Sequence, residues 1–280
     1  CQNSSAMIAF LSFFEGMPVW QKLGWVVFCI ALFWLLEGYY KDVSRPYNKT
    51  KHARVNFGLL ALVMVINVAF GVLASGVFVW LEQSQFGLLH LFSASIGVQL
   101  FLSVLVLDFI AQYSVHYLLH MVPWMWRLHL VHHTDKNVDV TTGTRHHPFD
   151  FMIREVFALF AVFIMGMPIS FYLFYRILSV LFTYWTHANI RLPGQLDRLL
   201  SYVIVTPGLH KFHHHNELPW TDRNFGNMLS VWDRLFGTFV YGDPKNIVFG
   251  VDSAAHIDDQ DFVVQLGAPF NASIKNKDAR

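Results

Sequence analysis

The sequence contains few cysteines and few charged residues. Only Cys1 and Cys29 occur among 280 residues, which excludes a disulfide framework and a thiolate-rich metal site. Charged residues make up 14% of the chain, whereas an ordinary soluble domain carries about 25%. The net charge is +1 and no basic stripe occurs, which excludes a nucleic-acid-binding protein. Because 54% of the residues are hydrophobic, we do not expect a normal water-soluble surface.

Long apolar stretches are present instead. A helix needs about 20 apolar residues to cross a hydrocarbon core, and three stretches approach or exceed this length, at about 19–36, 55–81 and 88–107. A fourth apolar region, 156–185, is interrupted by Gly166, Met167 and Pro168. It fits either a hairpin that dips into the bilayer from one side or one long span. A buried helix of a large soluble protein is the alternative for any one stretch, but four stretches together favour a membrane protein.

The charges between the apolar stretches predict an orientation. Residues 41–54 carry five lysines and arginines against one aspartate, whereas residues 82–87 carry no basic residue. By the positive-inside rule the first connection is cytoplasmic and the second is not. The chain then returns to the cytoplasmic side, and a hairpin at 156–185 would keep everything after residue 108 on that face.

The sequence therefore predicts an all-α, integral membrane helical bundle of about four membrane segments, with a cytoplasmic histidine-rich helical cap. We expect a single domain over residues 1–280. Transmembrane helices occupy about 19–107, a histidine-rich region that includes the hairpin occupies 108–241, and a polar tail occupies 242–280. One short strand is expected in this tail, around Ile247 to Val251.

Histidine is abundant and clustered. Twelve of the fifteen histidines lie between His116 and His215. Three patterns stand out, namely HxxxH at His116 and His120, HxxHH at His129, His132 and His133, and HxxHH again at His210, His213 and His214. Residues three or four positions apart lie on one face of a helix, so each pattern presents two or three imidazoles in one direction.

Aligned imidazoles indicate metal binding. Neutral imidazole is a ligand for iron, zinc, copper and nickel, and eight of them exceed the four ligands of a tetrahedral zinc. Two ions with about four or five nitrogen ligands each fit this number of imidazoles better. A lone HxxxH occurs by chance in many helices, but three patterns that follow membrane segments on one side favour a shared site. The isolated His52, His90 and His256 are treated as ordinary core or surface residues.

Further residues flank the three patterns. His187, at the end of the last apolar helix, is a candidate ninth ligand, and His147 is either a ligand or a group that supports one. Metal-bound histidines usually donate their second N–H to a carboxylate or carbonyl. Candidate acceptors are Asp108, Asp135, Asp139, Asp150, Asp222 and Asp233, although most of these acids could equally belong to a solvated surface. We expect Asp108 and Asp233, with Asn189, to support the ligands.

The order of these motifs resembles that of the fatty acid hydroxylase superfamily. The resemblance extends to Arg145-His146-His147-Pro148, to His187-Ala188-Asn189, and to the run from Asn224-Phe225-Gly226 through Ser230-Val231-Trp232-Asp233 to Thr238. It covers about residues 100–241. The group includes sterol desaturases, sterol methyl oxidases, sphingolipid hydroxylases and alkylglycerol monooxygenase. The tract from Leu196 to Pro207 looks most like bacterial sterol desaturase-like members.

The resemblance implies a membrane enzyme whose clustered histidines hold two iron ions, which zinc can replace in a purified sample. By position it implies metal ligands at His116, His120, His129, His132, His133, His187, His210, His213 and His214, with no catalytic residue beyond the ligands. Some members carry another histidine where this chain has Arg191. The ligand set is therefore either one short or completed elsewhere, with His147 as the candidate.

Such an enzyme uses O2 and two electrons to hydroxylate or desaturate a C–H bond of a lipid, such as a fatty acyl chain or a sterol. The sequence shows no GxGxxG motif after a strand, no flavin motif and no haem module, so we expect a separate reductase, ferredoxin or b-type cytochrome as electron donor. A bacterial inner membrane is favoured over the endoplasmic reticulum.

Two other kinds of membrane protein also use histidines. A metal-ion transporter places its ligands near the bilayer midplane within its spans, whereas these motifs lie mostly after the spans. A bis-histidine haem protein for electron transfer needs one histidine on each of two paired helices, so the HxxHH triplets exceed its requirement. Both remain alternatives to the oxygenase.

Overall fold

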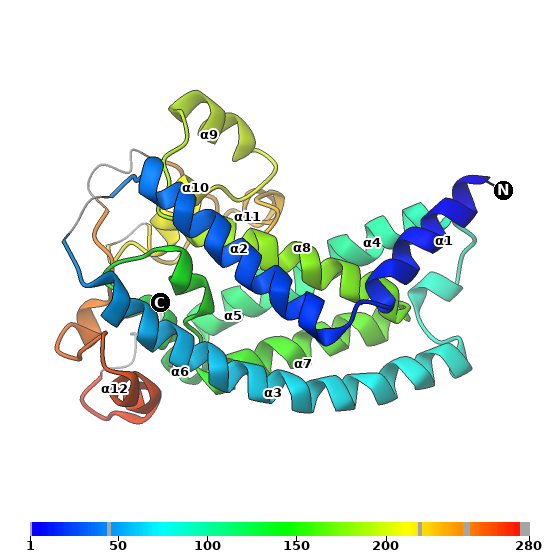
Figure 1. Cartoon of the computed structure of the whole chain (residues 1–280), viewed down its shortest axis with the longest axis horizontal. Coiled ribbons are helices and arrows are strands. Elements are labelled where there is room, and N and C mark those ends of the chain that lie inside the picture. The colour runs from blue at the N-terminus through cyan, green and yellow to red at the C-terminus, as the bar shows by residue number, and fades with distance from the viewer. Residues whose placement is uncertain (1, 44–45, 218–219, 243–246, 275–280) are drawn as a thin grey trace.

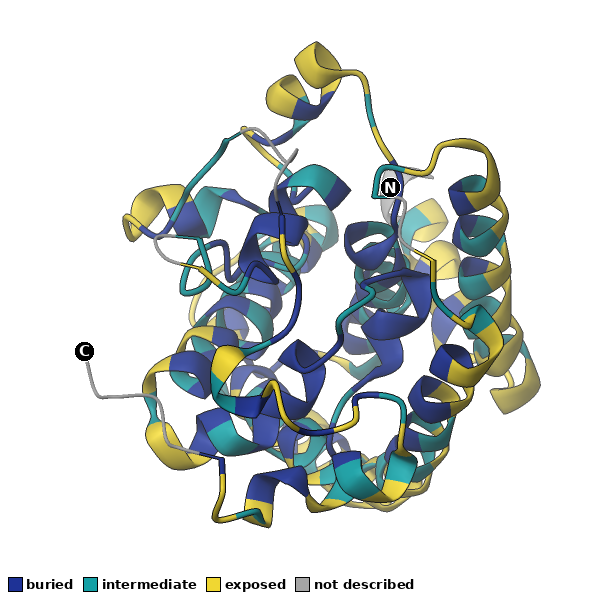
Figure 2. Cartoon of the chain, turned by 90° about the vertical axis from the view of Figure 1, so that its left-hand side faces the viewer, coloured by how far each residue is buried: buried dark blue, intermediate teal, exposed yellow. Residues whose placement is uncertain are grey.

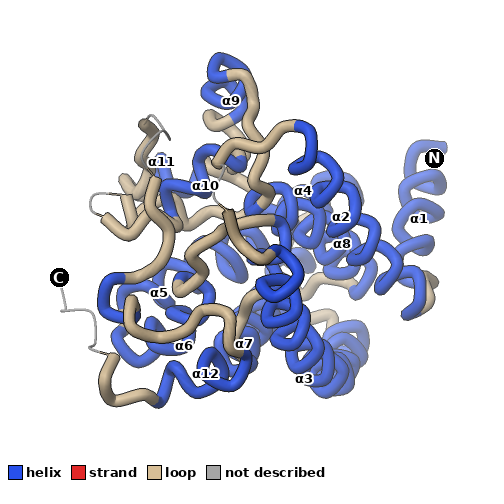
Figure 3. The backbone as a smooth tube through the Cα atoms, turned by 60° about the vertical axis from the view of Figure 1, so that its left-hand side comes forward, coloured by secondary structure: helices blue, strands red, loops and turns tan. Residues whose placement is uncertain are grey.

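The computed structural model describes residues 2–43, 46–217, 220–242 and 247–274. Its longer helices are α1 (Gln2–Glu15), α2 (Val19–Tyr39), α3 (Lys49–Ser84), α4 (Ile96–Asp108), α6 (Pro123–His133), α7 (Pro148–Met165) and α8 (Ile169–His187). The short helices are α5 (Val115–Met121), α9 (Gly194–Leu200), α10 (Pro207–His213), α11 (Val231–Leu235) and α12 (Phe262–Gly267). Within these described ranges the chain consists of helices and loops, as the all-α prediction requires (Figure 3).

The long helices form an elongated bundle, and the short helices gather at one of its ends (Figure 1). Three helical stretches in the described part of the chain are long and apolar enough to cross a membrane: Val19–Tyr39, Lys49–His90 and Ile96–Met121. The prediction of a helical membrane bundle is therefore confirmed. The number of membrane segments and the side on which the cap lies stay predictions.

The outer surface of the bundle suits contact with lipid. On α3, Val65, Val68 and Val72 are each 70% exposed. An apolar surface of this extent is unusual on a soluble monomer. Figure 2 shows exposed residues on the outside of the bundle and buried residues at its centre. Asn48 caps the N-terminus of α3, because its side chain accepts a hydrogen bond from the Lys51 amide. The 36 residues of α3 span about 54 Å, which exceeds the thickness of a hydrocarbon core.

The apolar region at 156–185 forms two antiparallel helices, α7 and α8, which a turn joins (Figure 1). That this hairpin dips into the bilayer from one side stays a prediction. The two helices extend further than expected, from Pro148 to His187. Gly166 ends α7 in a left-handed conformation with φ of 65°, and Pro168 precedes α8. The turn packs against Gly87, and a Cβ atom built on Gly166 would lie 1.9 Å from the Phe86 carbonyl oxygen. Only glycine therefore fits at this turn.

The third apolar stretch leads directly into the first histidines. Its helix begins at Ile96 rather than near Leu88, because Ser95 caps it and residues Leu88–His90 form a separate 3₁₀ turn, η1. A π-helix, η2 (Phe109–Ser114), joins α4 to α5 without a break. π-helical turns are rare in proteins, and those that do occur are often found at functional sites. α4 and α5 thus make one continuous rod that ends in the histidine-rich cap.

The C-terminal region belongs to the cap. Arg127 on α6 donates hydrogen bonds to the carbonyl oxygens of Pro269, Asn271 and Ile274, so the described part of the polar tail is packed against α6. The strand expected around Ile247 to Val251 is wrong. These residues are described and contribute one isolated antiparallel bridge, between Phe249 and His215, because no strand among the described residues lies beside them to extend the pairing.

Candidate metal centre

Nine of the predicted ligands come together in two adjacent groups. The five-histidine group consists of His116, His120, His129, His133 and His213, and the four-histidine group consists of His132, His187, His210 and His214. Within each group one nitrogen of every ring lies within 4.8 Å of the others. All nine residues are at most 6% exposed.

The HxxHH spacing explains why the groups adjoin. On α6, His129 and His133 lie one turn apart and face the five-histidine group, while the intervening His132 faces the other. α10 and the residue after it divide in the same way, since His213 belongs to the first group and His210 and His214 to the second. The rings of His133 and His214, one from each group, are 4.6 Å apart at their centroids.

In the five-histidine group, Nδ1 atoms point outward to oxygen acceptors. His116 Nδ1 donates to the Phe225 carbonyl oxygen at 2.8 Å, and His213 Nδ1 donates to that of Arg223 at 2.8 Å. His120 Nδ1 lies 3.1 Å from the Asp222 carboxylate. These contacts hold each ring in one orientation.

Two rings of the four-histidine group are held in the same manner. His132 Nδ1 donates to the Arg145 carbonyl oxygen at 3.1 Å, and His187 Nδ1 donates to the Thr183 carbonyl oxygen at 2.7 Å. Because a carbonyl oxygen only accepts, both rings carry their proton on Nδ1. Their Nε2 atoms, which face the centre of the group, therefore carry lone pairs.

These inward Nε2 atoms face one another at short distances. His187 Nε2 lies 3.1 Å from His132 Nε2. In the other group, His116 Nε2 lies 3.0 Å from His129 Nε2, and His129 Nδ1 meets the Asp150 carboxylate, so again two lone pairs face each other. Two lone pairs repel and do not form a hydrogen bond, whereas a cation between them binds both. Two nitrogens at right angles and about 2.1 Å from one ion would be about 3.0 Å apart, so the donor set fits a metal ion.

Burial keeps several of the clustered histidines neutral. Burial lowers the pKa of His129 to about 4, and it also lowers the pKa of His132, His133 and His214. A neutral imidazole is the form that binds metal. Among the described residues, neither ring nitrogen of His214 has a hydrogen-bond partner. A buried polar atom without a partner is costly, and a metal ion bound to one of these two nitrogens would give that nitrogen a partner.

His147 does not join either group. Its Nδ1 accepts a hydrogen bond from the Phe149 amide, where it caps α7, and its Nε2 lies 3.3 Å from the Leu266 carbonyl oxygen. The reason is positional, because His147 is the N-cap residue of α7 and its ring is held by the Phe149 amide and the Leu266 carbonyl oxygen. Arg191, at the position of the additional family histidine, is largely exposed and lies beside Asp42. The four-histidine group is thus not extended by either residue.

The three predicted supporting residues hydrogen-bond to backbone groups or to Trp232, and not to the histidine rings. Asp108 accepts hydrogen bonds from Trp232 Nε1 and the Leu229 amide. Asn189 pairs with the backbone of Val43. Asp233 accepts from the amides of Phe225 and Gly226, so it positions the carbonyl that orients His116 only indirectly.

The contacts of Asp150 with His146 and Arg154 are not among the predictions from the sequence. This buried carboxylate meets His129 Nδ1 and His146 Nδ1, each at 3.0 Å, and Arg154 Nε at 3.0 Å. His146 also stacks on His132, with ring centroids 4.7 Å apart. The signal was available, because His146, Asp150 and Arg154 follow one another at intervals of four residues and α7 therefore places Asp150 and Arg154 on one face.

Comparison with known proteins agrees with this geometry. The sequence model of the fatty acid hydroxylase family matches residues 100–238, which contain all nine clustered histidines. The chain belongs to the fatty acid hydroxylase family. No solved structure matches it significantly.

Several curated relatives are named as enzymes of lipids. The chain is 28% identical to the ornithine lipid hydroxylase OlsE of Rhizobium tropici over 62% of this chain and 50% of the relative. It is 26% identical to human alkylglycerol monooxygenase over 79% of this chain and 46% of the relative. It is also 28% identical to the fatty acid hydroxylase vlmA of a Lecanicillium species, over 56% and 47% of the two chains. The chain spans about half the length of these three relatives.

Proposed function

We propose that this protein is a membrane di-iron oxygenase that uses O2 and two electrons to hydroxylate a C–H bond of a lipid. The observation that carries the proposal is the pair of adjacent histidine groups whose inward nitrogen lone pairs face one another at 3.0–3.1 Å. Family membership supports the same reaction class. Desaturation, which removes a second hydrogen from the substrate in place of adding oxygen, is the alternative outcome at the same site.

The ligand set supports two ions of iron. Groups of five and four nitrogens match two ions with separate coordination spheres. Imidazole suits iron as well as zinc, but zinc has no redox chemistry, and the proposed reaction with O2 and two electrons would need a metal that changes oxidation state. Zinc can nevertheless occupy the site in a purified sample.

The protein positions the histidine rings and keeps bulk water out of the metal centre. Backbone carbonyls and carboxylates fix the ring orientations, and the burial of all nine histidines excludes bulk water. When bound, the irons would supply the oxidising power that O2 and two electrons provide for cleaving an unactivated C–H bond. The position of the lipid relative to this centre decides which hydrogen is lost.

The substrate proposed here is a lipid with an acyl or alkyl chain. The relatives are named for an ornithine lipid, alkylglycerols and a fatty acid, which supports such a chain over a sterol. We place the histidine cap on the cytoplasmic face of a bacterial inner membrane, since residues 41–54 carry five basic residues. A separate reductase, ferredoxin or b-type cytochrome on that side would deliver the electrons.

Metal analysis and lipid mass spectrometry test the proposal together. The full chain, extracted from membranes and loaded with ferrous iron, should hold about two irons and show no haem absorbance. Cells expressing it under isotopically labelled O2 should accumulate a lipid that has gained one labelled oxygen, and cells expressing His132→Ala or His213→Ala should not.

Other results would decide against the oxygenase. Loss of two hydrogens without labelled oxygen would assign desaturation. Vectorial metal flux across vesicles without any modified lipid would assign transport, and haem absorbance would assign electron transfer. An unchanged lipid profile in cells that contain the iron-loaded protein and a supply of electrons would refute the oxygenase.

A further inference from the structure

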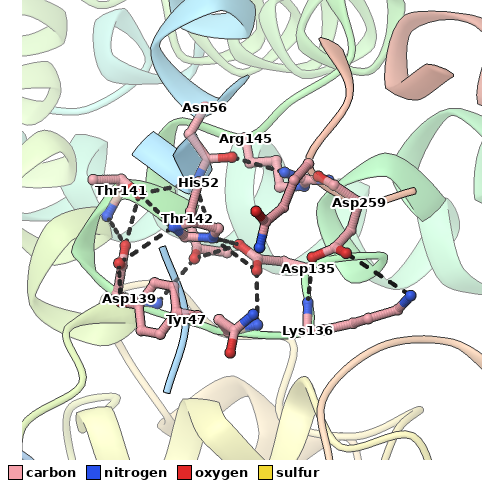
Figure 4. Close-up of polar contacts among 12 residues, drawn as sticks. Tyr47, His52, Asn56, Asp135, Lys136, Asp139, Thr141, Thr142, Arg145 and Asp259 are labelled. Carbon is pink, nitrogen blue, oxygen red and sulfur yellow. Dashed lines mark hydrogen bonds and ion pairs between the residues drawn. The ribbon is translucent and has the colours of Figure 1, made fainter. Parts of the chain in front are cut away.

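Figure 4 shows a second buried polar network. Arg145 links it to the four-histidine group through its backbone carbonyl. We call this network the loop clamp, and it consists of His52 and Asn56 on α3 together with Asp135, Asp139, Thr141 and Arg145. All six residues are 0% exposed. The last four lie on the segment between α6 and α7, which includes η3 (Val140–Thr144). The clamp therefore joins a membrane helix to the loop that follows the first HxxHH motif.

His52 binds the loop through both of its ring nitrogens. Its Nε2 lies 2.9 Å from both carboxylate oxygens of Asp135, and its Nδ1 lies 3.3 Å from Asp139 Oδ2. A ring that meets carboxylates on both sides donates to both only as the imidazolium cation. The pairing is inaccessible to water, so removing one partner would leave an uncompensated buried charge.

Asn56, one turn further along α3, holds the other end of the loop. Its Nδ2 donates to Thr141 Oγ1 at 2.8 Å, and its Oδ1 accepts from Arg145 Nη1 at 2.8 Å. The Arg145 guanidinium also donates to the carbonyl oxygens of Val131 and Asp259. Asn56 therefore connects α3 to η3 and, through Arg145, to α6.

The clamp ends on a metal ligand. The backbone carbonyl of Arg145 accepts the Nδ1 proton of His132, which belongs to the four-histidine group. A second membrane helix supports the same group, because Glu37 on α2 accepts hydrogen bonds from the amides of Val140 and Asn189. Asn189 lies two residues after the ligand His187.

The five-histidine group has a different set of supports. Its ring nitrogens are oriented by Asp150, Asp222 and the carbonyls of Arg223 and Phe225. These residues lie on α7 and on the loop between α10 and α11. The two groups thus adjoin at their rings but are oriented through separate hydrogen-bond shells.

We propose that His52 and Asn56 are positioning residues for one ion only, so that the two metal positions can be emptied independently. The inference rests on the two-ion site of the proposed function. Loss of the clamp frees the Arg145 carbonyl and with it the orientation of His132. Supports of this kind typically change metal affinity by about 10- to 100-fold.

The test compares Asn56→Leu, which keeps the size of the side chain and removes both hydrogen bonds, with Leu59→Ala on the same helix. Leu59 is equally buried and packs in the core near α12 and Trp126. The full chains are extracted from membranes, loaded with ferrous iron alone, and examined by metal analysis, by thermal unfolding and, after oxidation, by electron paramagnetic resonance.

We expect about two irons in the wild type and in Leu59→Ala, and about one in Asn56→Leu. The coupled pair of ferric ions in the wild type should be silent in the resonance spectrum, and Asn56→Leu should show the signal of an isolated ferric ion. Leu59→Ala should unfold at a lower temperature without this signal, which separates positioning from a general loss of stability.

Several results would overturn the inference. If the wild type holds two irons and Asn56→Leu also holds two with a silent spectrum, the clamp does not position the site, although the proposed function stands. Equal loss of both irons would show that the positions are not independent. If Asn56→Leu cannot be extracted folded, Thr141→Val takes its place, and failure of both variants to fold would make the network a folding element only. Fewer than two irons in the wild type would refute the proposed function as well.

Discussion

Replacing Asp150 with asparagine should weaken iron binding at the five-histidine group. The carboxylate is fully buried and meets His129 Nδ1, His146 Nδ1 and Arg154 Nε, each at 3.0 Å. The substitution keeps the shape of the side chain but exchanges one oxygen for an NH2 group. It therefore removes the negative charge and one acceptor in a place that water does not reach.

The structure gives two reasons for a loss of affinity. If the new NH2 group faces His129 Nδ1, the ring must carry its proton on Nε2, which is the atom directed at the metal site. If the amide oxygen faces His129 instead, Arg154 loses its carboxylate partner while its Nη2 stays 3.4 Å from His129 Nδ1. Groups that support a metal-bound histidine change affinity by about 10- to 100-fold, or about 1.4–2.8 kcal/mol.

The assay is a titration of the iron-loaded full chain with a chelator of known affinity, with Asp258→Asn as the control. Asp258 is 55% exposed and lies 3.9 Å from Lys51, so its substitution should leave iron binding unchanged. Thermal unfolding of both metal-free variants checks that they are folded. The reasoning is refuted if folded Asp150→Asn releases iron at the same chelator concentration as the wild type.

Further outcomes follow from the site and the fold. His132→Ala and His213→Ala each remove a ligand, so both should reduce iron loading and turnover by more than the factor of about 100 set by a supporting residue, while membrane fractionation should still recover the protein in the bilayer. Gly166→Ala would place a Cβ atom 1.9 Å from the Phe86 carbonyl oxygen at a φ of 65°, and it should cost about 2–5 kcal/mol of stability. Gly24→Ala, where no atom lies within 4 Å, is its control, and equal melting temperatures for the two would contradict the proposed contact. Burial lowers the pKa of His129 from 6.5 to about 4, so the unfolded chain binds more protons between these values. The metal-free protein should therefore become less stable as the pH falls through this window, and a melting temperature that is constant from neutral pH to pH 4 would argue against neutral buried histidines.

Eight of the nine clustered histidines could be predicted from helical spacing, and His187 from its place at the end of the last apolar helix. On a helix, HxxxH and HxxHH bring their rings to neighbouring positions on one side, and Gly166-Met167-Pro168 indicates a turn through local backbone chemistry alone. The division into five and four was not predictable. It depends on how α5, α6, α8 and α10 cross, and His132 and His133 are neighbours in the sequence but belong to different groups.

The supporting residues were harder to predict than the ligands. Most of the oxygen acceptors that orient the rings are backbone carbonyls, such as those of Arg145, Thr183 and Phe225. Every residue has a backbone carbonyl, so the residue type does not indicate which one accepts a hydrogen bond from a histidine ring. Asp108, which the sequence predicts as a support for the ligands, accepts a hydrogen bond from Trp232 instead. His52 was set aside as an isolated histidine, since its partners Asp135 and Asp139 lie more than 80 positions away.

The π-helix between α4 and α5 changes the phase of the rod that carries His116. On α4 the buried residues are Leu100, Ser103, Leu107 and Asp108, and a regular period of 3.6 residues counted from Leu107 would continue this stripe near positions 111, 114 and 118. The buried positions of α5 are instead Val115, His116, Leu119 and His120, about one residue later. One added residue corresponds to a rotation of about 100°. A helical wheel drawn continuously from Ile96 to Met121 therefore assigns His116 and His120 to the wrong side. The wide turn accommodates one extra residue, so deleting a single residue between Phe109 and Ser114 would leave a regular helix on which both imidazoles still face their partners on α6.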